Sequence, residues 1–161
     1  MESTLIDAAE SLLDTCRQRQ WTVATAESCT GGMVAAALTA IAGSSDVVDR
    51  GYVTYTNKAK HEMIGVPMAL FASVGAVSVE VARAMAEGAR KTAGVNLACG
   101  ITGVAGPGGG SAEKPVGLVH IAAASADRMI HERCLFAGDR HAVRLASALK
   151  ALEMMCNLAE G

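Results

Sequence analysis

Aromatic side chains are scarce in this sequence. Only 3% of the 161 residues are Phe, Trp or Tyr, although 51% of them are hydrophobic. A core must therefore be built from Ala, Val, Leu, Ile and Met, whose small side chains permit close packing of helices on a sheet. The length is that of one domain, which buries about two-thirds of its unfolded surface.

Basic runs and long apolar runs are also missing. The formal net charge is −2 and no cluster of Lys or Arg occurs, so the electrostatic footprint of a duplex-binding protein is absent and no nucleic-acid partner is expected. No apolar stretch reaches the roughly 18 residues of a membrane span, and the opening MESTLIDAAE lacks a signal core. These absences predict a soluble, cytoplasmic protein without a membrane partner.

Paired cysteines are missing as well. The cysteines are odd in number and scattered, and no CxxC spelling suggests a zinc site or a redox couple. We expect free thiols in a reducing cytosol, with no metal and no organic cofactor. The positions concerned are Cys16, Cys29, Cys99, Cys134 and Cys156.

Hydrophobic periodicity predicts alternating helices and strands, followed by a β-hairpin. This order predicts one α/β domain over residues 1–161, a three-layer α/β/α fold with a mixed sheet covered by helices on both faces. Ser3 or Thr4 is expected to cap the first helix, Ser78 the long middle helix, and Asp139 lies near the start of the last. Helices are predicted over 5–19, 31–41, 57–64, 67–72, after residue 78 and over 139–158, and strands over 22–26, 47–56, 95–102, 116–124 and 129–136.

The stretch TAESCTGG, residues 25–32, joins a predicted strand to a predicted helix. The start of a helix offers free N–H groups and a positive dipole end, a suitable place for an anion or an oxyanion. Ser28 has two interpretations, a helix cap or a nucleophile that attacks a carbonyl held there. Cys29 is a rival nucleophile, although such cysteines are more often small packing residues.

A nucleophilic serine needs a base. None is obvious among the histidines, because each is more easily explained as a structural residue or as a side chain exposed to solvent. They are His61, His120, His131 and His141. A lysine can take this role instead.

Two SxxK spellings, Ser111 to Lys114 and Ser147 to Lys150, lack the accompanying hydrolase motifs and are interpreted as chance. Other lysines follow Tyr55, which ends a predicted strand, the place where α/β sheets locate their sites.

The segment GVAGPGGGSAEKP, residues 103–115, is too rich in Gly and Pro to be a strand. Its backbone amides could surround a phosphate, although it is not a P-loop because no Gly-Lys-Ser/Thr triplet follows the glycines. A flexible connection is the alternative. Arg140 adds a guanidinium beside the start of the last helix, which suits an anion.

Together the stretches AESCTGG, IAGSS, RGYVTYTN, GAVS, GVAGPGGGS and FAGDR resemble the CinA C-terminal domain family over nearly the whole chain. The resemblance implies a three-layer α/β/α fold and hydrolysis of the carboxamide of nicotinamide mononucleotide to nicotinic acid mononucleotide and ammonia, a step of pyridine nucleotide salvage. Longer family members carry an additional N-terminal domain, so the chain is expected to be the stand-alone form. A homo-oligomer of open subunit number is also expected.

The resemblance further implies that Ser28 is the nucleophile, assisted by Tyr55 and Lys60. Around these residues we expect amides of Cys29, Thr30 and Gly31 to hold the oxyanion, and Thr102 and Gly103 to line the substrate site. The phosphate is expected at Gly106, Gly108, Gly109, Gly110, Ser111 and Arg140. A nucleotide-binding sensor without turnover is the alternative function.

The helical register separates two lysines. Lys58 lies three and four residues before His61 and Glu62, so it is expected in solvent. Lys60 lies at the same spacings from Met63 and Ile64, on the apolar stripe. Burial there should lower its pKa, as a base acting near neutral pH requires.

Overall fold

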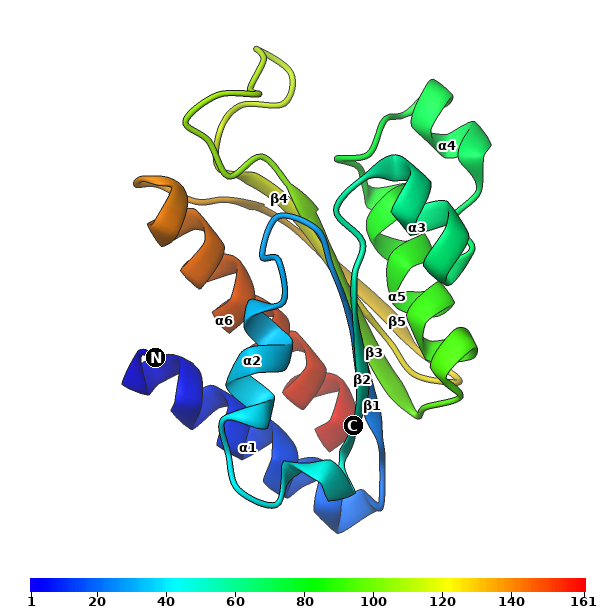
Figure 1. Cartoon of the computed structure of the whole chain (residues 1–161), viewed down its shortest axis with the longest axis vertical. Coiled ribbons are helices and arrows are strands. Elements are labelled where there is room, and N and C mark those ends of the chain that lie inside the picture. The colour runs from blue at the N-terminus through cyan, green and yellow to red at the C-terminus, as the bar shows by residue number, and fades with distance from the viewer.

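The computed structural model covers residues 1–161 and has three layers, with a five-stranded sheet between two layers of helices (Figure 1). The strand order is β2-β1-β3-β4-β5. β1 runs parallel to β2 and β3, whereas β4 is antiparallel to both β3 and β5. The predicted mixed sheet and α/β/α class are confirmed. The strands are β1 (Val23–Glu27), β2 (Val48–Val53), β3 (Leu97–Gly103), β4 (Leu118–Ala124) and β5 (Met129–Leu135).

Helices cover both faces of the sheet. One layer holds α1 (Ser3–Arg19), α2 (Met33–Thr39) and α6 (Arg140–Glu160), and the other holds α3 (Asn57–Ile64), α4 (Met68–Ser73) and α5 (Val79–Ala93) (Figure 1). A short 3₁₀ helix, Ser44–Asp46, precedes β2. None of the helices combines the length and the apolar character that crossing a membrane requires.

The largest core cluster, of 26 buried residues, lies between the sheet and the layer of α1, α2 and α6. It is built from Ala, Val, Leu, Ile, Met and Cys, as the composition predicts. On the opposite face, α5 packs so closely on β3 that a Cβ at Gly100 would lie 2.4 Å from the Ala82 carbonyl oxygen. Glycine at this position therefore sets the distance between helix and sheet.

Most predicted elements are confirmed within a few residues, and three details are wrong for identifiable reasons. α1 begins after Glu2 without a side-chain cap, so neither Ser3 nor Thr4 has the expected role. β2 ends at Val53, since the Thr56 side chain already caps α3 by accepting a hydrogen bond from the Ala59 N–H. β4 begins at Leu118 because Gly117, with φ 95°, lies in a turn.

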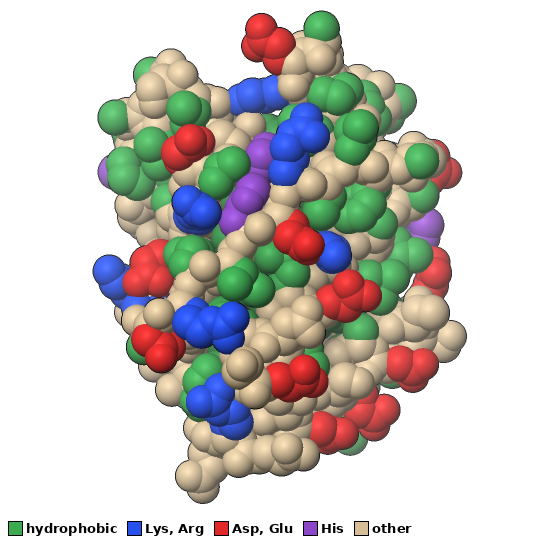
Figure 2. Space-filling view, turned by 180° about the vertical axis from the view of Figure 1, so that it is seen from behind, with side chains coloured by type: hydrophobic (Ala, Val, Ile, Leu, Met, Phe, Trp, Pro, Cys, Tyr) green, Lys and Arg blue, Asp and Glu red, His purple; other side chains and the backbone are tan.

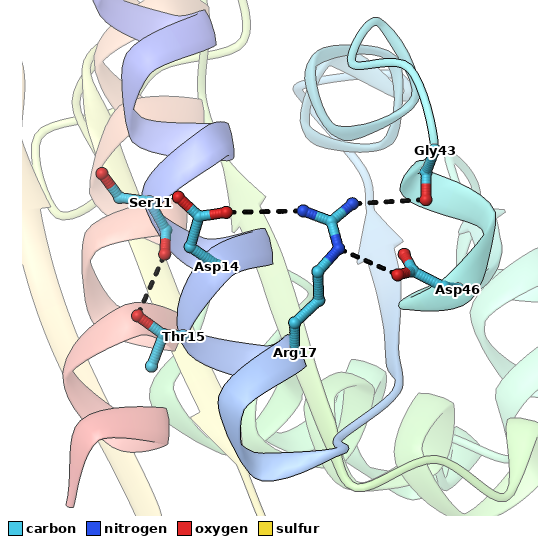
Figure 3. Close-up of polar contacts among 6 residues, drawn as sticks. All are labelled: Ser11, Asp14, Thr15, Arg17, Gly43 and Asp46. Carbon is cyan, nitrogen blue, oxygen red and sulfur yellow. Dashed lines mark hydrogen bonds and ion pairs between the residues drawn. The ribbon is translucent and has the colours of Figure 1, made fainter.

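Arg17 connects α1 to the segment before β2 (Figure 3). Its Nε donates to Asp46 Oδ2 at 2.9 Å and its Nη2 to the Gly43 carbonyl at 3.2 Å. Asp14 lies 3.4 Å from Nη1. These partners are a short helix and its preceding turn, so Arg17 has a structural role.

The face opposite that of Figure 1 carries acidic and basic side chains interspersed with one another (Figure 2). Two histidines pair across β4 and β5, with His120 Nδ1 2.9 Å from His131 Nε2. Burial and the neighbouring His131 lower the pKa of His120 to about 4, so His120 is uncharged at neutral pH, and burial also lowers the pKa of His131.

Gly100→Ala should destabilise the fold by about 3 kcal/mol, because the new methyl group must push α5 away from β3. The matched control is Gly108→Ala, where a Cβ has open space, and this variant should stay within about 1 kcal/mol of wild type. Denaturant unfolding measures both. Equal stability of the two variants would contradict the close packing of α5 on β3.

Candidate active site

A cavity of about 500 Å³ lies at the carboxyl ends of β1 and β3, at the upper end of the sheet in Figure 1. α/β sheets place ligands at this edge, and the volume is in the range of small-molecule sites. Segments that follow three different strands form its wall. The lining residues are Ser28, Cys29, Tyr55, Thr56, Asn57, Lys60, Ala76, Val77, Thr102, Gly103, Val104, Ala105, Gly106, Gly108, Gly109 and Arg140.

Ser28 lines this cavity and does not cap α2. The cap of that helix is the buried carboxylate of Glu27, which accepts the N–H groups of Val34 at 2.9 Å and Ala35 at 3.1 Å. The hydroxyl of Thr30 also donates to Glu27, at 2.7 Å. Because Glu27 already occupies the positive end of α2, the helix start is not available to a substrate anion.

Lys60 contacts the Ser28 hydroxyl, with Nζ 2.9 Å from Oγ. Its other partners are two carbonyl oxygens, of Thr54 at 2.9 Å and Tyr55 at 3.2 Å. The residue is only 1% exposed, and burial lowers its pKa to about 8. The predicted burial of Lys60 is confirmed.

Lys58 points into solvent, where it lies 3.9 Å from Glu62. Its side chain is 80% exposed. The helical register predicted from the sequence, with one lysine inside and the other outside, is therefore confirmed.

Tyr55 reaches the site through its main chain. Its carbonyl accepts from Lys60 and lies 3.3 Å from Ser28 Oγ, while its side chain is exposed and its hydroxyl lies 3.1 Å from Nη2 of Arg140. In this arrangement the phenol makes no contact with Ser28, so a proton relay through the Tyr55 side chain does not fit the geometry.

The amides expected around an oxyanion are not equivalent. The Gly31 N–H is occupied, since it donates to the Ser28 carbonyl at 3.0 Å. The N–H groups of Cys29 and Thr30 have no acceptor within the chain, but only Cys29 lines the cavity and Thr30 is fully buried. The Cys29 N–H is therefore the donor best placed to meet a ligand.

Thr102 and Gly103, which were expected at the substrate site, line the cavity at the end of β3, the strand that pairs with β1. The Thr102 hydroxyl donates to the Ala76 carbonyl at 2.8 Å. This bond fixes the apolar pair Ala76 and Val77 at the cavity.

The glycine-rich segment 103–115 contributes Gly106, Gly108 and Gly109 to the cavity, and the N–H groups of all three are unpaired within the chain. The Arg140 guanidinium donates to the Gly106 carbonyl at 2.8 Å, so it lies against this segment. The other two expected phosphate ligands lie outside the lining. Gly110 packs on Val116, and Ser111 forms a turn with Lys114.

The alternative groups considered for catalysis are not placed to act. Burial raises the pKa of the Cys29 thiol to about 11, which disfavours the reactive thiolate. No histidine lines the cavity. In the two SxxK spellings the lysines bind elsewhere, Lys114 to the Val74 carbonyl and Lys150 to Glu132.

Several site residues were not predicted from the sequence. Thr56, Asn57, Ala76, Val77, Val104 and Ala105 all line the cavity. The first two lie where a predicted strand ends and a predicted helix begins, the next two lie just before the predicted cap Ser78, and the last two lie in the predicted loop 103–115. Glu27 belongs to the AESCTGG stretch but its capping role depends on the path of the chain. Arg144, which binds the carbonyl groups of Cys29 and Thr30, was also missed. Its spacing of four residues from Arg140 is the signal, because such residues share a helix face.

Known proteins resemble this chain closely. A CinA-like protein of Anaeromyxobacter dehalogenans is 54% identical over 133 residues, which are 83% of this chain and 33% of that protein. A protein of Enterobacter agglomerans named nicotinamide-nucleotide amidohydrolase PncC is 49% identical over 138 residues, covering 85% of this chain and 84% of that protein. This chain spans about a third of the length of several such CinA-like relatives.

Solved structures agree with the sequence comparisons. The competence/damage inducible protein CihA from Agrobacterium tumefaciens superposes with a TM-score of 0.96 at 46% identity, over 98% of this chain and 97% of that one. The sequence model of the CinA C-terminal domain matches residues 6–159. The chain therefore belongs to the CinA C-terminal domain family.

Proposed function

We propose that this protein hydrolyses the carboxamide of nicotinamide mononucleotide, giving nicotinic acid mononucleotide and ammonia, as a step of pyridine nucleotide salvage. The observation that carries the proposal is the buried amine of Lys60, 2.9 Å from the Ser28 hydroxyl at the wall of a cavity. The 49% identity to a protein named nicotinamide-nucleotide amidohydrolase supports this choice of substrate. No metal or organic cofactor enters the scheme.

In the first step, Ser28 Oγ attacks the carboxamide carbon while the neutral Lys60 amine takes its proton. The geometry suits this transfer. When Lys60 is neutral, its two remaining N–H groups donate to the carbonyls of Thr54 and Tyr55, so the lone pair is directed at Ser28. The Cys29 N–H stabilises the oxyanion, a contribution of roughly 3 kcal/mol in comparable sites.

In the second step, the oxyanion collapses and the C–N bond breaks. Lys60 returns the proton to the departing nitrogen, which leaves as ammonia, and the acyl group remains as an ester on Ser28. Water then attacks the ester with Lys60 again accepting the proton, and the carboxylate product is released with the Ser28 hydroxyl restored. A single lysine thus serves both half-reactions.

The phosphate of the substrate binds where the glycine-rich segment and Arg140 line the cavity. Gly106, Gly108 and Gly109 offer unpaired N–H groups, and Arg140 adds positive charge. Guanidinium and backbone N–H groups are well suited to a phosphate dianion. The amide end of the substrate is then directed toward Ser28.

Incubation with nicotinamide mononucleotide and an ammonia assay test the function directly. Wild type and Lys58→Ala should release ammonia saturably, with or without chelator, whereas Ser28→Ala should fold and bind the mononucleotide without turnover, because the attacking oxygen is lost. Calorimetric binding by wild type without ammonia release would indicate a sensor instead. Full activity in a folded Ser28→Ala variant would show that Ser28 is not the nucleophile.

The stability of the protein should report the lowered pKa of Lys60. Between pH about 8 and about 10.5 the folded state holds Lys60 neutral while the unfolded state still protonates it. The unfolded state then binds more protons, so the free energy of unfolding rises with pH in this window. Denaturant unfolding should show this rise in wild type relative to Lys60→Met. If the free energy of unfolding depends on pH in the same way in the two proteins, then the pKa of Lys60 is not lowered by folding.

Arg140→Ala should raise KM for the mononucleotide far more than KM for nicotinamide riboside, which lacks the phosphate. The reason is that Arg140 lies against the glycine-rich segment, at the proposed phosphate site. Steady-state kinetics with both substrates provide the measurement. Equal effects on the two KM values would assign Arg140 a structural role only.

A further inference from the structure

Arg144, on α6, holds the turn that carries Ser28. Its Nε donates to the Cys29 carbonyl at 3.0 Å and its Nη2 to the Thr30 carbonyl at 3.1 Å. The same turn is closed by the Gly31 N–H, which donates to the Ser28 carbonyl. A single planar group thus binds the carbonyls of both central residues of a four-residue turn that begins at the proposed nucleophile.

The guanidinium has no carboxylate partner, since none of the ion pairs in the structure includes Arg144. Its side chain is partly buried, and a Cβ at Gly31 would lie 3.3 Å from its Nη2. A buried or half-buried arginine usually has an acidic partner. Here the guanidinium is held by two peptide carbonyls of the turn instead of by a carboxylate.

The turn is held from its other side by Glu27. That carboxylate accepts the Thr30 hydroxyl and the first free N–H groups of α2. With the carbonyls bound by Arg144 and the hydroxyl bound by Glu27, the peptide planes between Cys29 and Gly31 cannot rotate freely. The Cys29 N–H lies in the adjoining Ser28–Cys29 peptide, whose carbonyl accepts the Gly31 N–H. The direction of this N–H, and the position of Ser28 Oγ relative to Lys60, therefore depend on the turn that Arg144 and Glu27 hold.

We infer that Arg144 is a positioning residue for the reaction at Ser28. Through the turn, it keeps the nucleophile at Lys60 and the Cys29 N–H directed at the developing oxyanion. It makes no contact with the cavity, so it should contribute little to substrate binding. The substrate in this inference comes from the proposed function, whereas the contacts of Arg144 are observed independently of that function.

The test compares Arg144→Ala and Arg144→Lys with Arg17→Ala. Arg17 is the matched control because it also binds a backbone carbonyl and joins two segments (Figure 3), but it is not among the residues that line the cavity. We expect Arg144→Ala to lower kcat by about a hundredfold, as a small misplacement of the reacting groups does, with KM nearly unchanged. Added guanidinium should restore part of kcat. Arg144→Lys should remain impaired, because an ammonium cannot span two carbonyls as a planar fork does.

The rate at which a fluorophosphonate labels Ser28 gives a second readout that needs no natural substrate. It should fall in both Arg144 variants and stay at the wild-type value in Arg17→Ala. If wild type labels but releases no ammonia from the mononucleotide, the proposed function fails and the labelling rates alone decide the role of Arg144. If Arg144→Ala does not fold, Arg144→Lys decides it.

Three results would overturn the inference. The first is an unchanged kcat and labelling rate in a folded Arg144 variant. The second is a loss of kcat that is explained by lower protein stability, that is equal to the loss in Arg17→Ala, and that added guanidinium does not restore. The third is a wild-type protein in which Ser28 is not labelled at all.

Discussion

The contact between the Lys60 amine and the Ser28 hydroxyl is the interaction on which the site depends. An amine that is 1% exposed loses most of its hydration, and its pKa falls to about 8. The carbonyls of Thr54 and Tyr55 compensate part of that loss and also direct the nitrogen at Ser28. None of the four histidines lines the cavity, so the proposed base near neutral pH is this lysine.

The rest of the fold brings these two groups together. β1 and β2 are parallel neighbours, so the residues after each strand, Ser28 and Tyr55, meet at the same edge of the sheet. α6 begins at the cavity, with Arg140 and Arg144 in its first turns and one helical turn apart. The first contacts the glycine-rich segment and the second contacts the turn of Ser28. One helix face therefore connects the proposed phosphate end of the cavity with the proposed reaction centre.

Much of this could be predicted from the sequence, but only where local spacing determines the outcome. The periodicity of residues 57–64 placed Lys60 on the buried face and Lys58 in solvent, and the structure agrees. The roles of Glu27, of the Tyr55 carbonyl and of Arg144 depend on how distant segments meet. The start of α2 illustrates the difference, because its free N–H groups were predicted correctly but the anion that occupies them is a side chain of the preceding strand.

The central claim is that Lys60 must be neutral to accept the proton of Ser28, and the pH dependence of kcat/KM for ammonia release tests it most directly. The account predicts that kcat/KM rises about tenfold per pH unit at low pH and levels off above an apparent pKa near 8, the value that burial gives Lys60. A rate that is independent of pH through this range, or that falls as pH rises toward it, would contradict the account.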